Sequence, residues 1–182
     1  MKVPSSRRVR ALLAIGPLVG LSWLGAYAAF TDSVDVTTSF STGSVSIRAN
    51  DQTGTVAFTS LSMTNMIPGT VRYAPLRISN AGTLNFNYTM STAVTGSAPL
   101  ASALLIGIKG VPSSTCDATT YAASSDTAYA SAAGLGSAAI AARPLAASAS
   151  EFLCFRVELP SGAANSLQGL TTSATFTFNA TT

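Results

Sequence analysis

Apolar and polar residues alternate along most of the chain after residue 30. A period of two places successive side chains on opposite faces of a β-strand. Short breaks of small or polar residues separate the alternating stretches, and the break at residues 79–83 suits a hairpin turn. The alternating apolar positions are Val34, Val36 and Phe40; Val45 and Ile47; Val56 and Phe58; Leu76 and Ile78; Leu84, Phe86, Tyr88 and Met90; Leu153, Phe155, Val157 and Leu159; and Ala174, Phe176, Phe178 and Ala180.

About eight short strands with regular turns predict an all-β fold, a single antiparallel β-sandwich of Greek-key or jelly-roll type. Two segments depart from the alternation. Residues 100–106 suit either a short helix or another strand, and their period does not decide between these. Residues 112–150 consist mainly of Ala, Ser, Thr and Gly, so we expect an insertion that leaves the sandwich. Such an insertion is either a binding loop or subunit contact, or a tolerated surface segment.

The N-terminus has the three-part pattern of a secretory signal peptide. Four basic residues precede an uncharged, mostly apolar run over residues 11–29, which ends in the small-residue triplet at residues 26–28. We therefore expect a signal peptide over residues 1–28, with cleavage after Ala28 or Ala29, and one domain over residues 29–182. A retained membrane anchor is the alternative, and the run's glycines, proline and marginal length argue against it.

Signal cleavage changes the charge of the chain. The full sequence has 10 Lys and Arg and 7 Asp and Glu, a formal net charge of +3. Loss of the four basic residues before the apolar run leaves 6 of those 10 against all 7 acidic residues, which gives a net charge near −1. This balance does not favour a nucleic-acid partner or an anionic membrane surface. We also expect no stable membrane anchor in the mature form.

Cys116 and Cys154 are the two cysteines of the chain. Export would bring them into an oxidising environment, so we expect a disulfide between them. A redox or zinc site is the alternative, but the chain has no CxxC spacing and no histidine to supply further ligands.

The absence of histidine excludes most hydrolytic chemistry. Neither a Ser/His/Asp triad, nor a Cys/His pair, nor a HExxH zinc helix can be built from this sequence. The acidic residues are scattered, and no glycine-rich phosphate loop is present. Residues 50–54 faintly resemble a calcium loop and are better explained as a turn. We therefore expect no enzymatic activity and no metal or other cofactor.

Several stretches resemble a known family. Residues 25–33 (GAYAAFTDS) are similar to the cleavage region of bacterial proteins processed by the SipW-type signal peptidase, a group that includes the biofilm-matrix fibre protein TasA and camelysin. Residues 65–70 (NMIPGT) and 76–84 (LRISNAGTL) resemble a stretch of the same family, and residues 151–178 resemble its C-terminal strands less specifically.

The resemblance implies a jelly-roll subunit that is secreted, released by a signal peptidase, located in the extracellular matrix or on the cell surface, and able to polymerise into fibres. Camelysin-like relatives have been classed as metallopeptidases, an activity that a chain without histidine cannot inherit through histidine ligands.

The N-terminal segment of the mature chain suits a donor strand. An extended segment can add to the open sheet edge of a neighbouring subunit, and head-to-tail addition produces filaments. Asp32 and Asp35 would keep the free segment soluble. The residues expected to enter the neighbour are Phe30, Val34, Val36 and Phe40. The alternative is that this segment pairs within its own sandwich.

Two functions thus remain open from the sequence. The first is a secreted structural subunit that forms a homopolymer by donor-strand addition. The second is a monomeric secreted binding module that recognises a carbohydrate or another surface ligand. Charged residues at positions 36 and 40 would abolish assembly of a subunit and leave a binding module unchanged.

Overall fold

The structure is a computed structural model that describes residue 38 and residues 41–182. The expected signal peptide, its cleavage site and the expected donor residues Phe30, Val34, Val36 and Phe40 lie outside this described part. Residues 42–182 form one compact unit with its own core. None of the helices among the described residues combines the length and the apolar character that a membrane span requires.

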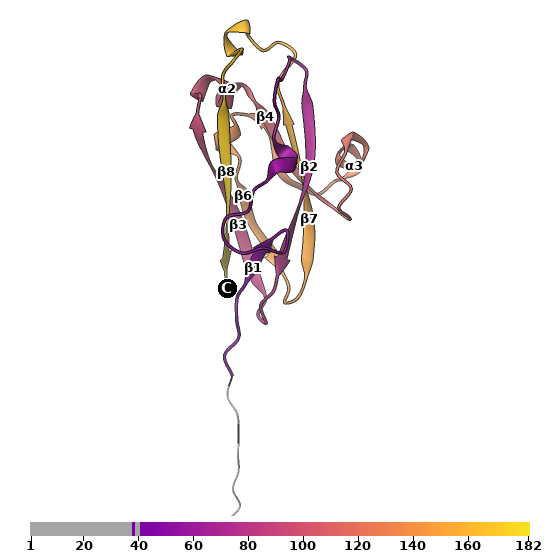
Figure 1. The fold of residues 1–182 in the computed structure, drawn as a ribbon. Coiled ribbons are helices and arrows are strands. Elements are labelled where there is room, and N and C mark those ends of the chain that lie inside the picture. The colour runs from indigo at the N-terminus through magenta and orange to yellow at the C-terminus, as the bar shows by residue number, and fades with distance from the viewer. Residues whose placement is uncertain (1–37, 39–40) are drawn as a thin grey trace, which may run out of the picture. The chain divides into compact units, whose positions relative to one another are not determined.

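The compact unit contains two antiparallel sheets, which confirms the all-β prediction (Figure 1). One sheet has five strands in the order β1-β2-β7-β4-β5, and the other has three in the order β6-β3-β8. The strands are β1 (Ile47–Ala49), β2 (Val71–Asn80), β3 (Phe86–Gly96), β4 (Leu105–Val111), β5 (Thr127–Ala133), β6 (Ile140–Leu145), β7 (Ser150–Glu158) and β8 (Thr172–Thr181).

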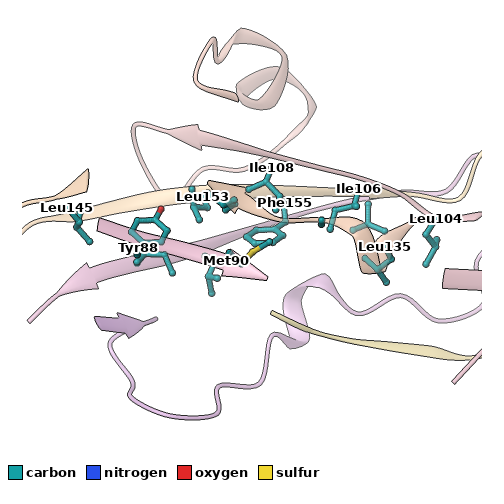
Figure 2. Close-up of a cluster of buried hydrophobic side chains, with 14 of the residues drawn as sticks. Tyr88, Met90, Leu104, Ile106, Ile108, Leu135, Leu145, Leu153 and Phe155 are labelled. Carbon is teal, nitrogen blue, oxygen red and sulfur yellow. The ribbon is translucent and has the colours of Figure 1, made fainter. Parts of the chain in front are cut away.

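The core lies between the two sheets and follows the alternation of the sequence. Tyr88 and Met90 point inward from β3, and Leu153 and Phe155 point inward from β7 (Figure 2). All four are at most 2% exposed, whereas their neighbours on the other face of each strand are more exposed, except Cys154, which is buried beneath the segment that covers the outer face of β7. Burial of alternate apolar side chains therefore fixes which face of each strand lies against the other sheet.

Short helical turns connect the strands. Residues 100–106, for which the sequence allowed a helix or a strand, form the end of one helix and the start of one strand. A single residue separates the end of the helix α2 (Ala98–Ala103) from the start of β4. The Ser97 hydroxyl accepts a hydrogen bond from the Leu100 amide and caps the helix, and a proline lies in its first turn. The other turns are η2 (Thr59–Leu61), α3 (Ala118–Ala123), η3 (Leu135–Ser137) and η4 (Asn165–Leu167).

The predicted insertion over residues 112–150 is only partly outside the sheets. Residues 112–126 leave the sandwich and carry α3, but β5 pairs with β4 and β6 pairs with β3. The small side chains of β5 and β6 lack the large apolar alternation of the other strands, so the sequence pattern does not indicate them. Pairing with apolar neighbouring strands makes them part of the sheets.

The predicted hairpin at residues 79–83 is wrong, because β2 and β3 belong to different sheets. The segment is a corner organised by Asn80, which is 2% exposed. Its side-chain nitrogen donates to the main-chain carbonyl oxygens of Leu84, Leu145 and Ala146. Its side-chain oxygen accepts from the Gly82 main-chain amide. A Cβ atom at position 82 would lie 2.3 Å from the Ser44 carbonyl oxygen, so glycine is required there.

Substitution of this asparagine should destabilise the fold. Asn80→Ala leaves buried carbonyl and amide groups without partners, and we expect a loss of about 2 to 3 kcal/mol in the free energy of unfolding, measured by urea denaturation. The matched control is Asn85→Ala, because Asn85 is exposed and, among the described residues, its side chain makes a single hydrogen bond, which it accepts from the Ala147 amide. Equal effects of the two substitutions would contradict a special role for Asn80.

Candidate functional site

Strand β8 forms one edge of the three-stranded sheet. Among the described residues its only strand partner is β3, along a register that runs from Asn87↔Thr181 to Gly96↔Thr172. The inward side chains of β8, which include Phe176 and Phe178, are only half-buried, although Phe86, Tyr88 and Met90 of β3 are buried. An edge strand presents unpaired N–H and C=O groups that can pair with another strand.

A groove of about 700 Å³ opens beside this edge, between the two sheets. We call it the β8 groove. Its apolar walls include Phe58 and Met63 from the loop after β1, Leu100 and Leu104 from α2 and its C-cap, Val157 from β7 and Phe176 from β8. None of the described residues that line it is charged. The groove therefore suits an uncharged, apolar occupant that also offers main-chain hydrogen bonds to β8.

Residues 53–66 cover part of the β8 groove, and we call them the covering segment. The Phe58 ring lies edge-on to Phe155 and Phe176, with centroid distances of 5.2 and 6.4 Å. Leu61, Met63 and Met66 of the same segment are also half-buried against the core. In Figure 1 the turn η2 within this segment lies between β8 and β2.

The alternation of Val56 and Phe58 predicts a strand, and this prediction is wrong. Within the described part of the chain, residues 53–57 make no main-chain hydrogen bond. Later in the segment, the Leu61 and Ser62 amides donate to carbonyls of its own turn, and the Arg72 guanidinium donates to the Ser60 carbonyl oxygen. The covering segment is thus held mainly by side-chain packing.

The opposite side of the same sheet is closed by a polar network. The Arg143 guanidinium on β6 donates to both oxygens of Asp126, at 2.9 and 2.8 Å, and also binds Glu151 on β7. The hydroxyl of the buried Tyr88 on β3 donates to the Glu151 carboxylate. Charge-assisted hydrogen bonds therefore join the two sheets on the β6 side.

The network perturbs the proton affinities of its members. Burial, with the Glu151 carboxylate beside it, raises the pKa of the Tyr88 hydroxyl. Hydrogen bonds to Asp126 and Glu151 raise the pKa of Arg143, and the same guanidinium lowers the pKa of the Asp126 carboxyl. Tyr88 thus stays neutral and Arg143 charged at ordinary pH. The β8 side, by contrast, is closed by apolar loop contacts.

The predicted disulfide between Cys116 and Cys154 is confirmed, with a Cα–Cα distance of 5.3 Å. It fastens the excursion after β4 to the outer face of β7. Tyr121 of α3 lies over Gly107, where a Cβ atom would approach its hydroxyl to 2.2 Å. The Lys109 ammonium lies 4.9 Å from the centroid of the Tyr121 ring. These contacts fix the excursion over the five-stranded sheet, away from the β8 groove.

The segment over residues 50–54 forms a turn. Asn50 and Asp51 both have positive φ angles, and the Asn50 side-chain oxygen accepts from the Arg77 amide. The Asp51 carboxylate forms an ion pair with the Arg77 guanidinium at 2.7 Å. In the described part of the chain, no three His, Cys, Asp or Glu residues lie together as a candidate metal site.

The comparisons leave the family of the chain open. No family model matches it, and it shows no significant similarity to a curated protein. The site must therefore be interpreted from its own geometry.

The sequence did not indicate the β8 groove or its covering segment. Leu61, Met63 and Met66 follow no strand or helix period, so the apolar content of the segment was the only available signal. The expected donor residues Phe30, Val34, Val36 and Phe40 lie outside the described residues, and their role stays a prediction.

Proposed function

We propose that the chain is a secreted structural subunit of an extracellular matrix or cell surface. In this proposal, subunits polymerise head to tail, and residues 30–40 of one subunit occupy the β8 groove of the next. The observation that carries the proposal is the uncharged groove, lined in part by apolar side chains, beside a sheet edge with one strand partner among the described residues. The proposed role requires no catalytic chemistry.

The chemistry of the groove matches that of the expected donor strand. An added strand gains main-chain hydrogen bonds to the edge, and its alternate side chains enter the space between the sheets. Val34, Val36 and Phe40 share one phase of the alternation and are apolar, as are the leucine, methionine, valine and phenylalanine side chains that form part of the groove lining. Asp35 has the other phase and would face away from the groove, whereas Asp32 shares the phase of these residues and would have to lie beyond the apolar part of the groove.

The topology of this contact favours a polymer. The donor segment and the β8 groove are different surfaces of the chain, so the contact is heterologous and each subunit can both donate and accept. A heterologous contact that does not close into a ring produces a filament.

We further propose that the two sheets are a jelly roll and that the chain is related to the TasA/camelysin family. The support is the resemblance of residues 25–33, 65–70 and 76–84 to that family. In the structure, residues of the third stretch have a clear physical role, because Asn80 and Gly82 shape the corner between the two sheets.

Electron microscopy tests the proposed function. The mature chain that begins at Phe30 should form filaments in negative stain and a matching increase in light scattering. A variant that begins at Gly43 lacks the donor segment and should remain monomeric, with an unchanged circular dichroism spectrum. If both chains stay monodisperse at high concentration, mildly acidic pH and high salt, polymerisation is contradicted and a monomeric binding module becomes the better explanation.

A further inference from the structure

The covering segment carries the side-chain pattern of a strand without the hydrogen bonds of one. Val56 and Phe58 alternate with small or polar residues, as the expected donor residues do. The Phe58 ring packs edge-on against Phe155 of one sheet and Phe176 of the other, and these two rings also contact each other, with centroids 5.0 Å apart. The segment therefore fills with its side chains a position that an added strand would fill.

The main chain of this segment is bound far more weakly than that of a strand. Residues 53–57 have no main-chain hydrogen bond to the rest of residues 41–182, whereas β3 pairs with β8 along ten positions. A strand added to β8 gains ladder hydrogen bonds that the covering segment does not make. Regions with few backbone hydrogen bonds open at lower free energy than the core.

The ends of the segment are suited to movement. Gly54 and Asn65 both have positive φ angles, 78° and 52°. A Cβ atom at Gly54 would meet nothing within 4 Å, so the chain has open space around this position. Movement of the residues between these two points requires the hydrogen bond from the Arg72 guanidinium of β2 to the Ser60 carbonyl oxygen to break.

From these observations we infer that the covering segment is a displaceable cover of the β8 groove, which leaves when a donor strand enters. This inference rests on the proposed function. In the free subunit the covering segment shields the apolar side chains of the groove from non-specific association with other chains. It also lowers the rate of strand addition, because only the fraction of subunits whose covering segment has moved away from β8 can accept a donor.

Seeded filament growth tests the cover. Phe58→Ala removes its largest anchor, and we expect the mature chain with this substitution to elongate seeds about tenfold faster than the wild type. Phe152→Ala is the matched control, because Phe152 is also half-buried but lies on the outer face of β7, away from the β8 groove. The control should elongate at the wild-type rate.

A second measurement needs no substitution. Hydroxyl-radical footprinting of the wild type should show Phe58 and Met63 becoming more reactive when free subunits join filaments, because displacement exposes both side chains. This result decides the question even if Phe58→Ala fails to fold.

The contrary outcomes are distinct. Equal or slower growth of the folded Phe58→Ala variant would show that Phe58 is part of the wall on which the donor packs. Lower reactivity of Phe58 and Met63 in filaments would likewise contradict displacement of the covering segment. Neither result would contradict the proposed polymerisation. If the wild type forms no filaments, the proposed function and the cover fail together.

Discussion

A mature chain with Val36→Asp and Phe40→Asp should remain a folded monomer and form no filaments. In the proposed assembly both side chains enter the β8 groove, whose described lining contains no charged residue to pair with a carboxylate. Removing an unpaired carboxylate from water costs several kcal/mol, so two of them should raise the dissociation constant of the subunit contact by more than about a thousandfold. Sedimentation velocity and negative-stain microscopy measure this loss.

The same charges on the opposite face of the donor provide the control. Thr37 and Ser39 have the other phase of the alternation, so Thr37→Asp and Ser39→Asp place two carboxylates on the side of the strand that faces away from the groove. This variant should still assemble. Filaments from the first variant, or an equal loss in both, would contradict donor-strand addition with the expected phase.

Removal of the disulfide should cause the largest loss of stability without affecting the groove. Cys116 and Cys154 are 38 positions apart, and closing a loop of this size stabilises the fold by about 4 kcal/mol in the chain-entropy account. We expect the variant with Cys116→Ala and Cys154→Ala to lose free energy of unfolding of that size. Urea denaturation of the oxidised protein and of the variant measures the difference.

Reduction supplies the internal control for this prediction. A reducing agent should lower the stability of the wild type toward that of the alanine variant and leave the variant itself unchanged. A loss below about 1 kcal/mol would show that the contacts of Tyr121 and Lys109, rather than the covalent bond, fix the excursion over β7. The variant should still form filaments at temperatures where it is folded.

The strands with strong alternation could be predicted from the sequence. The interior positions of β3, β7 and β8 follow directly from apolar residues at every second position. The same pattern at Val56 and Phe58 misleads, because alternation reports which side chains are buried and not whether the main chain finds a partner. Strand pairing is decided by the rest of the fold.

Other features depend on contacts that are distant in the sequence. The turn chemistry of residues 79–83 indicates a change of chain direction, but it contains no information on which sheet the next strand joins. The Tyr88 hydroxyl and its partner Glu151 are 63 positions apart, and neither belongs to a recognisable motif. The β8 groove itself is a space between elements, so no single stretch of sequence encodes it.

The unequal closure of the two sides has a mechanical consequence. The Arg143 network holds the sheets together along β6, whereas the covering segment spans the β8 side with apolar contacts. Thermal opening of the sandwich should therefore be a rotation of the two sheets about an axis that runs along β6. The two sheets then separate most at β8, so the subunit can admit a strand there. The hydrogen bonds of Arg143 on the β6 side keep the two sheets in register.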